Sequence, residues 1–372
     1  MFRRVSANTE GVRVLRNTLL PLRKIVNLTM NLGASDLGID LGTANTLVCI
    51  PGRGVVLMEP SVVAVKAGTR RSGILIDSAV GFQAKMMMER APESFHIVRP
   101  LKDGVIADFE LTEIMLRYFI RRVRKHAWGG RPRMVISVPS GITAVEKRAV
   151  RSTAMNAGAR KVFTIAEPKA GAVGAGLPIS EPRGQMVIDI GGGTTEVAVL
   201  SLGDVVTLES LRVAGDEMDI AVKEYVRDVY GLEIGLRTAE EVKIAIGSAY
   251  ALPQELKCEI RGKDIAAGLP RRMEITSEEI REALSQPLAQ IVEAARSCLN
   301  RTLPELASDL IDTGITLIGG GALLPGIDKM IEEQTGLRVR VADDPITAVA
   351  RGTAMLLDKL DEYEDVLAED ER

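Results

Sequence analysis

Two short segments of matching composition could bind phosphate: Asp40-Leu-Gly-Thr-Ala-Asn-Thr46 and Asp189-Ile-Gly-Gly-Gly-Thr-Thr195. Each follows a run of apolar residues that is typical of a strand. An aspartate at the end of a strand can hold a metal-bound water, and the Gly and Thr residues after it form a tight turn whose amides can face a phosphate. Two such turns facing each other would form a phosphate clamp.

Asp40 and Asp189 are predicted to lie on the magnesium side of this clamp, acting through water because magnesium keeps much of its hydration shell. For one Asp-Gly pair the simpler interpretation is that the aspartate only starts a turn, but the matched pair favours function. The residues expected to present amides and hydroxyls to the phosphates are Gly42, Thr43, Ala44, Asn45, Gly191, Gly192, Gly193, Thr194 and Thr195. Neither turn contains lysine, so metal and backbone dipoles must balance the phosphate charge.

A third glycine turn, Gly319-Gly320-Gly321-Ala322, follows the apolar run Ile315 to Ile318. Glycines at such a turn let a ligand approach the backbone closely. Each of the three turns is a weak signal by itself, because most glycine runs after a strand are only tight turns. Three of them in this order and spacing are a specific signal.

The elements that must position these turns repeat along the chain. Strands flank the first turn at 37–40 and 46–50, and the second at 186–190 and 197–201. Further strands are expected at 55–58, 61–66, 134–138, 162–166, 205–213 and 315–318, and helices at 111–125, from 145, and at 169–176, 216–230, 239–250, 277–300, 326–334 and 346–357. The repetition predicts a duplicated α/β domain with a nucleotide in the cleft between the halves.

Composition excludes several other classes of protein. The 372 residues suffice for two domains, and a 46% hydrophobic content can form sizeable cores. Three cysteines without C-x-x-C spacing and only two histidines argue against a disulfide scaffold, a zinc site or a Ser-His-Asp triad. The net charge of -3 gives no reason to expect a nucleic-acid partner. The longest uncharged stretch, 313–327, is shorter than the ~18 residues of a spanning helix, so no transmembrane segment is expected.

The two ends of the sequence differ in charge. Residues 1–35 carry six Lys or Arg and one Glu, whereas residues 358–372 carry eight acids and two bases. For residues 1–35 two interpretations stay open. One is an interfacial amphipathic helix, interrupted by Pro21, and the other is a misassigned start with translation beginning at Met30. The predicted division of the chain is a basic extension (1–35), domain I (36–170), domain II (171–345), a helix returning to domain I (346–360) and an acidic tail (361–372).

Taken together, the motifs resemble the actin, sugar kinase and DnaK-type chaperone ATPase superfamily, and in detail its MreB family of bacterial actin-like proteins. The matching segments are Ile39-Asp-Leu-Gly-Thr-Ala-Asn-Thr-Leu, Arg99-Pro-Leu-Lys-Asp-Gly-Val-Ile-Ala-Asp108, Ile188-Asp-Ile-Gly-Gly-Gly-Thr-Thr-Glu-Val-Ala-Val199, Ala214-Gly-Asp-Glu-Met-Asp219 and Ile318-Gly-Gly-Gly-Ala-Leu-Leu324. The resemblance runs from about Asp36 to Leu360. It implies an actin fold of four subdomains, ATP with magnesium in the central cleft, and polymerisation into membrane-attached filaments that organise wall synthesis in rod-shaped bacteria.

The resemblance also assigns a catalytic role to Glu146. By spacing alone, Thr143-x-x-Glu146 is an ordinary helix capping box. The family resemblance implies instead that this glutamate orients or deprotonates the attacking water, with Asp189 as its catalytic partner on the metal side. We therefore expect Glu146→Ala to remove hydrolysis and spare ATP binding. Glu167, which precedes Pro168, is a second expected cleft carboxylate.

Other residues take nucleoside and membrane roles from the same resemblance. Glu240 and Lys243 share a helix face, and with Gly320, Gly321 and Ala322 they are expected to flank the adenosine. Gly215 and Asp216 are expected near the nucleotide, although Asp216 could equally cap the following helix. Trp128, the single tryptophan, lies in a loop near several arginines. It is expected to insert into an anionic membrane surface, the alternative being a tryptophan folded onto the core.

The leading hypothesis is therefore an ATPase that assembles with itself into paired protofilaments on the inner face of the cytoplasmic membrane. Membrane proteins of the elongation machinery are expected partners by family resemblance. A sugar-kinase type of phosphotransferase would share the clamp but need a substrate motif, and none is recognisable. A DnaK-type chaperone would need a long peptide-binding region after the ATPase core. A plasmid-segregation or organelle-positioning filament remains an alternative within the same fold.

Overall fold

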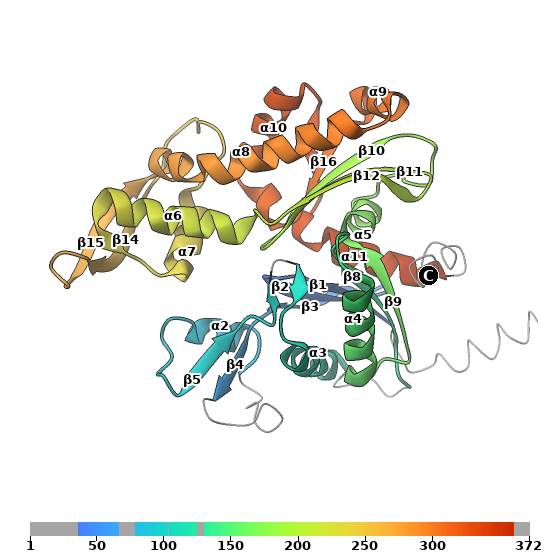
Figure 1. The fold of residues 1–372 in the computed structure, drawn as a ribbon, viewed down its shortest axis with the longest axis horizontal. Helices are drawn as coiled ribbons and strands as arrows, with labels where there is room; N and C mark the ends of the chain where they lie inside the picture. Colours follow the sequence, from blue (N-terminus) through green and yellow to red (C-terminus); the bar gives the residue numbers. More distant parts are fainter. Residues whose placement is uncertain (1–35, 67–78, 103, 125–129, 361–372) are drawn as a thin grey trace, which may run out of the picture.

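The structure is a computed structural model, and it describes residues 36–66, 79–102, 104–124 and 130–360. Two five-stranded sheets have the same construction. In lobe I the strand order is β3-β2-β1-β8-β9, and in lobe II it is β12-β11-β10-β16-β17. In both, three antiparallel strands are followed by two parallel ones. The predicted duplication of an α/β unit is confirmed, and Figure 1 shows the two lobes one above the other.

Most of these strands lie close to their predicted positions, because apolar residues recur in each, whereas no strand is predicted at β17. Those of lobe I are β1 (Leu37–Leu41), β2 (Asn45–Ile50), β3 (Gly54–Pro60), β8 (Arg133–Val138) and β9 (Lys161–Ala166). Those of lobe II are β10 (Gln185–Ile190), β11 (Thr195–Ser201), β12 (Asp204–Leu211), β16 (Ile315–Ile318) and β17 (Val339–Val341). All six side chains of β10 are buried, as expected for a central strand covered on both faces.

Helices cover the faces of both sheets. They are α3 (Phe109–Arg124), α4 (Ala144–Ala157), α5 (Glu167–Gly174), α6 (Gly215–Tyr230), α8 (Ser277–Arg301), α9 (Pro304–Thr313), α10 (Ile327–Thr335) and α11 (Ala348–Asp358), with short 3₁₀ turns at Gly320–Leu323 and Pro345–Thr347. A capping box begins α8, where the Thr276 side chain accepts from the Glu279 amide. Among the described residues, no helix combines the length and apolar character needed to cross a membrane.

Each lobe carries a smaller appended part at the mouth of the cleft. In lobe I it contains β4 (Val63–Lys66), α2 (Phe82–Met87) and β5 (Phe95–Val98), and the short pair β6 (Leu101–Lys102) and β7 (Val105–Ile106) follows. In lobe II it contains β13 (Leu232–Glu233), α7 (Leu236–Ile246), β14 (Lys257–Asp264) and β15 (Pro270–Thr276). The hairpin of β14 and β15 is not foreseen from sequence, because β14 buries only one of its eight side chains and shows little apolar alternation.

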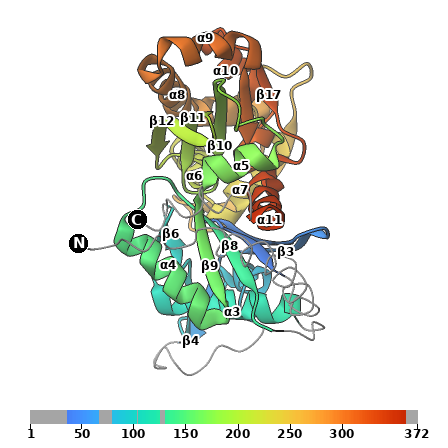
Figure 2. The same cartoon turned by 90° about the vertical axis from the view of Figure 1, so that its right-hand side faces the viewer.

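The two lobes are joined through α5 and α11, which pack against each other and lie side by side in Figures 1 and 2. Glycines allow this approach. A Cβ atom at Gly174 would overlap the carbonyl oxygen of Ala348, and one at Gly352 would overlap that of Ala170. Helix α11 also contacts β1, β2 and β8 of lobe I. The residue boundaries of the domains stay predictions.

Candidate functional site

The first and second glycine turns lie in direct contact at the inner end of the cleft. Asp40 and Asp189 are the second-to-last residues of β1 and β10, at equivalent places in the two sheets. A Cβ atom added to Gly192 would lie 2.5 Å from the Ala44 Cβ, and one added to Gly193 would lie 2.9 Å from the Thr43 Cγ2. Only glycine permits this spacing. The predicted clamp geometry, two turns facing each other, is present.

The third turn packs against the second. Gly319 has φ of +82°, and a Cβ there would overlap Asp189 and the Ile190 carbonyl. A Cβ atom at Gly321 would likewise overlap the Ile190 side chain. Because β16 runs parallel beside β10, the carboxyl ends of both strands meet at one edge of the sheet, which is where ligands bind in sheets of this kind.

The three turns enclose one cavity of about 580 Å³ between the lobes. A volume of this size suits a ligand as large as a nucleotide. The predicted residues that line it are Asp40, Gly42, Thr43, Ala44, Asn45, Glu167, Asp189, Gly191, Gly192, Gly193, Thr194, Gly215, Asp216, Glu240, Lys243, Gly319, Gly320 and Gly321.

Four carboxylates gather at the inner end of this cavity: Asp40, Glu167, Asp189 and Glu196. Burial, and then the charge of Asp40, raise the pKa of Asp189 to about 8. Burial raises the pKa of Asp40 to about 6, opposed by the Ser137 hydroxyl, which donates to it at 3.1 Å. Burial and the neighbouring carboxylates hold the pKa of Glu167 well above its usual range. Like charges this close need a cation or protons to coexist.

The donor set fits a hydrated divalent cation. Mutual repulsion among the carboxylates would be relieved by a cation, and oxygen ligands are those that magnesium prefers. Among residues 36–66, 79–102, 104–124 and 130–360, no three His, Cys, Asp or Glu side chains converge closely enough to ligate a metal directly. Binding of magnesium by Asp40 and Asp189 through water stays a prediction.

The outer half of the cavity is built by α6 and α7. The amide of Asp216 donates to the Gly192 carbonyl at 2.7 Å, which joins the start of α6 to the second turn. Lys243 donates to the Gly215 carbonyl at 2.8 Å and pairs with Asp219 at 2.7 Å, so its partner is not Glu240. Burial raises the pKa of Asp219 to about 6, and Lys243 opposes that shift.

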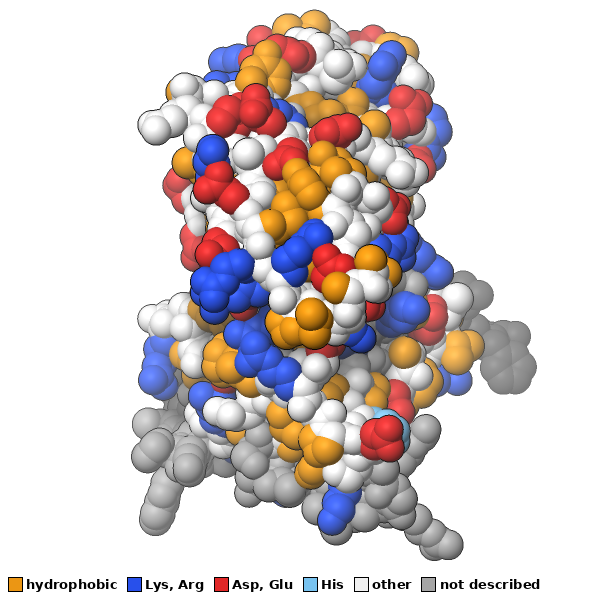
Figure 3. Space-filling model, turned by 90° about the vertical axis from the view of Figure 1, so that its left-hand side faces the viewer, with side chains coloured by type: hydrophobic (Ala, Val, Ile, Leu, Met, Phe, Trp, Pro, Cys, Tyr) orange, Lys and Arg blue, Asp and Glu red, His pale blue; other side chains and the backbone are white. Residues whose placement is uncertain are grey.

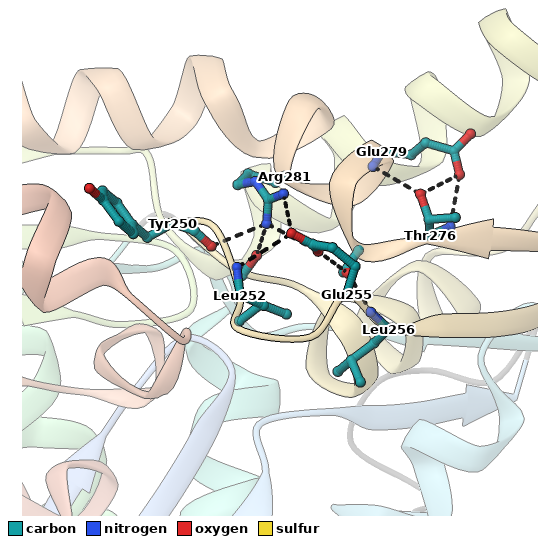
Figure 4. Close-up of polar contacts among 9 residues, drawn as sticks. Tyr250, Leu252, Glu255, Leu256, Thr276, Glu279 and Arg281 are labelled. Carbon is teal, nitrogen blue, oxygen red and sulfur yellow. Dashed lines mark hydrogen bonds and ion pairs between the residues drawn. The ribbon is translucent and has the colours of Figure 1, made fainter.

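A polar network supports the loop between α7 and β14, which lies behind the part of the cavity wall that α6 and α7 build (Figure 4). Arg281 of α8 donates to the Ser248 hydroxyl at 2.8 Å and the Tyr250 carbonyl at 3.1 Å, and pairs with Glu255 at 2.8 Å. The amide of Ala249 in the same loop donates to the Pro325 carbonyl at 2.8 Å. Because Pro325 lines the cavity, this network fixes the wall from outside.

Ion pairs cross the mouth of the cleft from lobe I to lobe II. Lys85 of α2 pairs with Glu240 of α7 at 2.7 Å, and Arg99 pairs with Asp216 of α6 at 2.7 Å. Figure 3 views this side and shows Lys and Arg side chains gathered where the lobes meet, with acidic side chains among them. Glu240, predicted to flank the adenosine, and Asp216, predicted to lie near the nucleotide, thus each pair with a residue of the opposite lobe.

Three predicted residues are not brought to the cavity. The Glu146 side chain is partly exposed and accepts from the amide and hydroxyl of Thr143, both at 2.7 Å, which closes the capping box of α4. These bonds lower its pKa. Glu146 does not line the cavity, and its catalytic role stays a prediction. Thr195 is buried and donates to the Val213 carbonyl at 2.7 Å. Ala322 is buried behind the third turn. Trp128 lies outside the described residues.

Sequence reasoning gave no role to several lining residues. Glu196 lies within a matched motif but carries no spacing signal, because its partner Ser140 is far away in the sequence. Lys85 likewise carries no spacing signal, since its partner Glu240 belongs to the other lobe. Apolar side chains also line the outer cavity, namely Met58, Ile244, Leu323 and Leu324. The exposed Ile244 and Leu323 could be recognised only once the cleft was known.

Two equivalent sheets, joined by two packed helices around one cavity, define an actin-like protein, as predicted. Solved structures agree with this class. MreB5 of Spiroplasma citri bound to ADP has a TM-score of 0.84 at 37% identity, covering 89% of this chain and 98% of that one. The MamK double helical filament shares the fold, with a TM-score of 0.73 at 22% identity over 87% of this chain and 98% of that one.

The chain belongs to the MreB/Mbl protein family, whose sequence model matches residues 34–365. The cell shape-determining protein MreB of Escherichia coli strain K12 is 51% identical over 332 residues, 88% of this chain and 94% of that protein. The cell shape-determining protein Mbl of Bacillus subtilis strain 168 is 46% identical over 328 residues, 88% of this chain and 97% of that protein. The family resemblance drawn from the glycine turns is confirmed.

Proposed function

We propose that this protein is an ATP-dependent filament-forming ATPase that assembles at the inner face of the cytoplasmic membrane and maintains rod shape by organising wall synthesis. The observation that carries the proposal is the contact of Gly192 with Ala44, which sets two phosphate-binding turns face to face in one cavity. Support comes from related proteins, since MreB5 of Spiroplasma citri has been solved bound to ADP and to AMPPNP. The E. coli relative is a cell shape-determining protein.

In the proposed complex, the amides of Gly42 to Asn45 and Gly191 to Thr194 hold the phosphates from two sides. Gly215, Asp216, Lys243 and the third turn surround the nucleoside, with Ile244 and Leu323 as apolar contacts for the base. When bound, magnesium would supply positive charge to the phosphates and to the neighbouring carboxylates. Asp40 and Asp189 orient its waters.

We assign the water-positioning role to Glu167 rather than to Glu146. Glu167 begins α5 immediately after β9, the edge strand of the lobe I sheet, and it lines the cavity at the carboxyl end of that strand. It lies beside Asp40, Asp189 and Glu196, and burial together with these charges raises its pKa, so its ionised form is a stronger base than an exposed glutamate. Hydrolysis depends mainly on holding the water in line with the phosphate.

Membrane binding rests on the sequence at Trp128 and on residues 1–35, both outside the described residues. One inserted tryptophan contributes roughly 2 kcal/mol and each nearby cation about 1 kcal/mol. A single subunit would therefore bind weakly, and a filament that repeats the loop would bind firmly. A blue shift of Trp128 fluorescence with anionic vesicles would support insertion, whereas an unchanged spectrum would count against it.

A phosphotransferase of the same superfamily is the second candidate, because the same clamp serves kinases. Electron microscopy of the purified full chain with ATP, magnesium and anionic lipid separates the two. Paired filaments on the lipid support the proposal. No assembly over a range of salt and protein concentrations, together with phosphorylation of a small acceptor, would favour the kinase.

A further inference from the structure

Glu196 is a buried carboxylate that the reaction as described above does not use. Its side chain is 1% exposed, and it stands directly opposite Asp189 in the antiparallel pair of β10 and β11. Two like charges at opposite positions of a sheet destabilise it, and burying a carboxylate adds to that cost. Folding alone therefore gives no reason for a glutamate at this place.

Glu196 is bound to the other lobe. The Ser140 amide donates to Glu196 Oε1 at 2.9 Å, and the Ser140 hydroxyl donates to Oε2 at 3.1 Å. Ser140 follows β8 of lobe I, whereas Glu196 lies on β11 of lobe II. Hydrogen bonds to a charged acceptor are among the stronger ones in proteins. The pair thus joins the lobes at the inner end of the cleft, opposite the ion pairs at its mouth.

The loop that contains Ser140 adjoins both phosphate turns. A Cβ atom at Gly104 would lie 3.0 Å from Pro139 Cγ and 3.0 Å from Thr194 Cγ2. The Gly104 amide donates to the Thr43 hydroxyl at 3.2 Å. Thr43 of the first turn, Thr194 of the second turn and the start of the Ser140 loop therefore meet around one glycine.

We infer that Glu196 is a positioning residue for hydrolysis, acting through Ser140 to hold the two phosphate turns in register when the cleft is closed. The inference rests on the proposed ATPase function and deepens it. The contact of Gly192 with Ala44, and with it the backbone amides of both turns, remains in place without this link. In-line attack needs the water held by Glu167 and the phosphate held by both turns to be aligned, and small misplacements reduce the rate strongly. Loss of the link should lower kcat and leave affinity nearly unchanged.

Steady-state hydrolysis and equilibrium binding of a fluorescent ATP analogue test this in the full chain. We expect Ser140→Ala to lower kcat by about 5-fold and Glu196→Ala by ~10- to 100-fold, with Kd within about 2-fold of wild type. Glu196→Gln keeps an acceptor for the Ser140 amide and should restore most of the rate. Ser140→Ala should add little in the Glu196→Ala background, because the bond is already absent.

A matched control is Ser297→Ala, which removes a hydroxyl that donates to Glu209 at 3.2 Å within lobe II; its kcat should equal that of wild type. Additive losses in the double variant, or equal losses of kcat and affinity in folded protein, would overturn the inference. So would wild-type kcat in both Ser140→Ala and Glu196→Ala. A wild-type chain that neither binds nor hydrolyses ATP would overturn the proposed function itself, so the two failures are distinguishable.

Discussion

Gly192 of lobe II lies against Ala44 of lobe I so closely that a side chain at Gly192 would stand 2.5 Å from the Ala44 Cβ. This contact brings the two turns of the proposed phosphate clamp together, and the proposed nucleotide site depends on it. Gly192→Ala should push the turns apart. Because overpacking costs ~1–3 kcal/mol, we expect ATP affinity to fall about 10-fold, measured by titration calorimetry. The control is Gly130→Ala, whose added Cβ would meet no atom within 4 Å. Equal affinities in the two variants would contradict the proposed clamp.

Glu167→Gln and Glu146→Ala separate the cavity carboxylate from the helix cap. We expect Glu167→Gln to lower kcat by ~10²-fold or more with ATP binding retained, because general-base catalysis contributes at least that much. Glu146→Ala should retain most hydrolysis and lower the free energy of unfolding by about 1 kcal/mol through loss of the cap. Hydrolysis assays measure kcat, and denaturant unfolding measures the free energy of unfolding, for each variant. A large loss of kcat in Glu146→Ala alone would restore the assignment made from the family pattern.

The contrast between Glu167 and Glu146 shows how much of the site could be predicted from the sequence. The three turns were predictable because each follows an apolar strand and carries its own glycines. Glu146 could not be placed in the same way, because Thr143-x-x-Glu146 satisfies a local capping rule and the spacing does not say which carboxylate reaches the cleft. The Glu196 bond to Ser140 and the Lys85 pair with Glu240 join residues distant in sequence. Such contacts are set by tertiary packing and leave no periodic pattern.

Stability of the nucleotide-free protein should fall as pH rises. Burial and neighbouring carboxylates raise the pKa of Asp189 from 3.8 to about 8. The folded state therefore holds the Asp189 proton more tightly than the unfolded chain does. The stabilising contribution of Asp189 to the free energy of unfolding is complete below pH ~4 and is lost as pH rises through about 8. Denaturant unfolding between pH 5 and 9, without magnesium, should show a decreasing free energy of unfolding. Asp189→Asn should reduce the slope, and an unchanged slope would contradict this origin.

The ion pairs at the cleft mouth should slow nucleotide exchange. Lys85 and Glu240 are both partly exposed, so their pair is worth about 0.5–1 kcal/mol. We expect Lys85→Ala to speed release of a fluorescent ATP analogue about 2- to 5-fold in stopped-flow measurements. Lys257→Ala breaks a pair with Glu274 inside the β14–β15 hairpin and serves as control. If both variants release nucleotide at the wild-type rate, the mouth pairs do not restrain the cleft.

The most direct test of the whole account is sedimentation of the purified chain at increasing concentration, with and without ATP and magnesium, for wild type and Gly192→Ala. The account predicts that wild type pellets above a critical concentration only when both ATP and magnesium are present, and that Gly192→Ala stays in the supernatant. Pelleting that is the same without nucleotide, or the same in Gly192→Ala, would contradict the claim that nucleotide held between the two turns drives assembly.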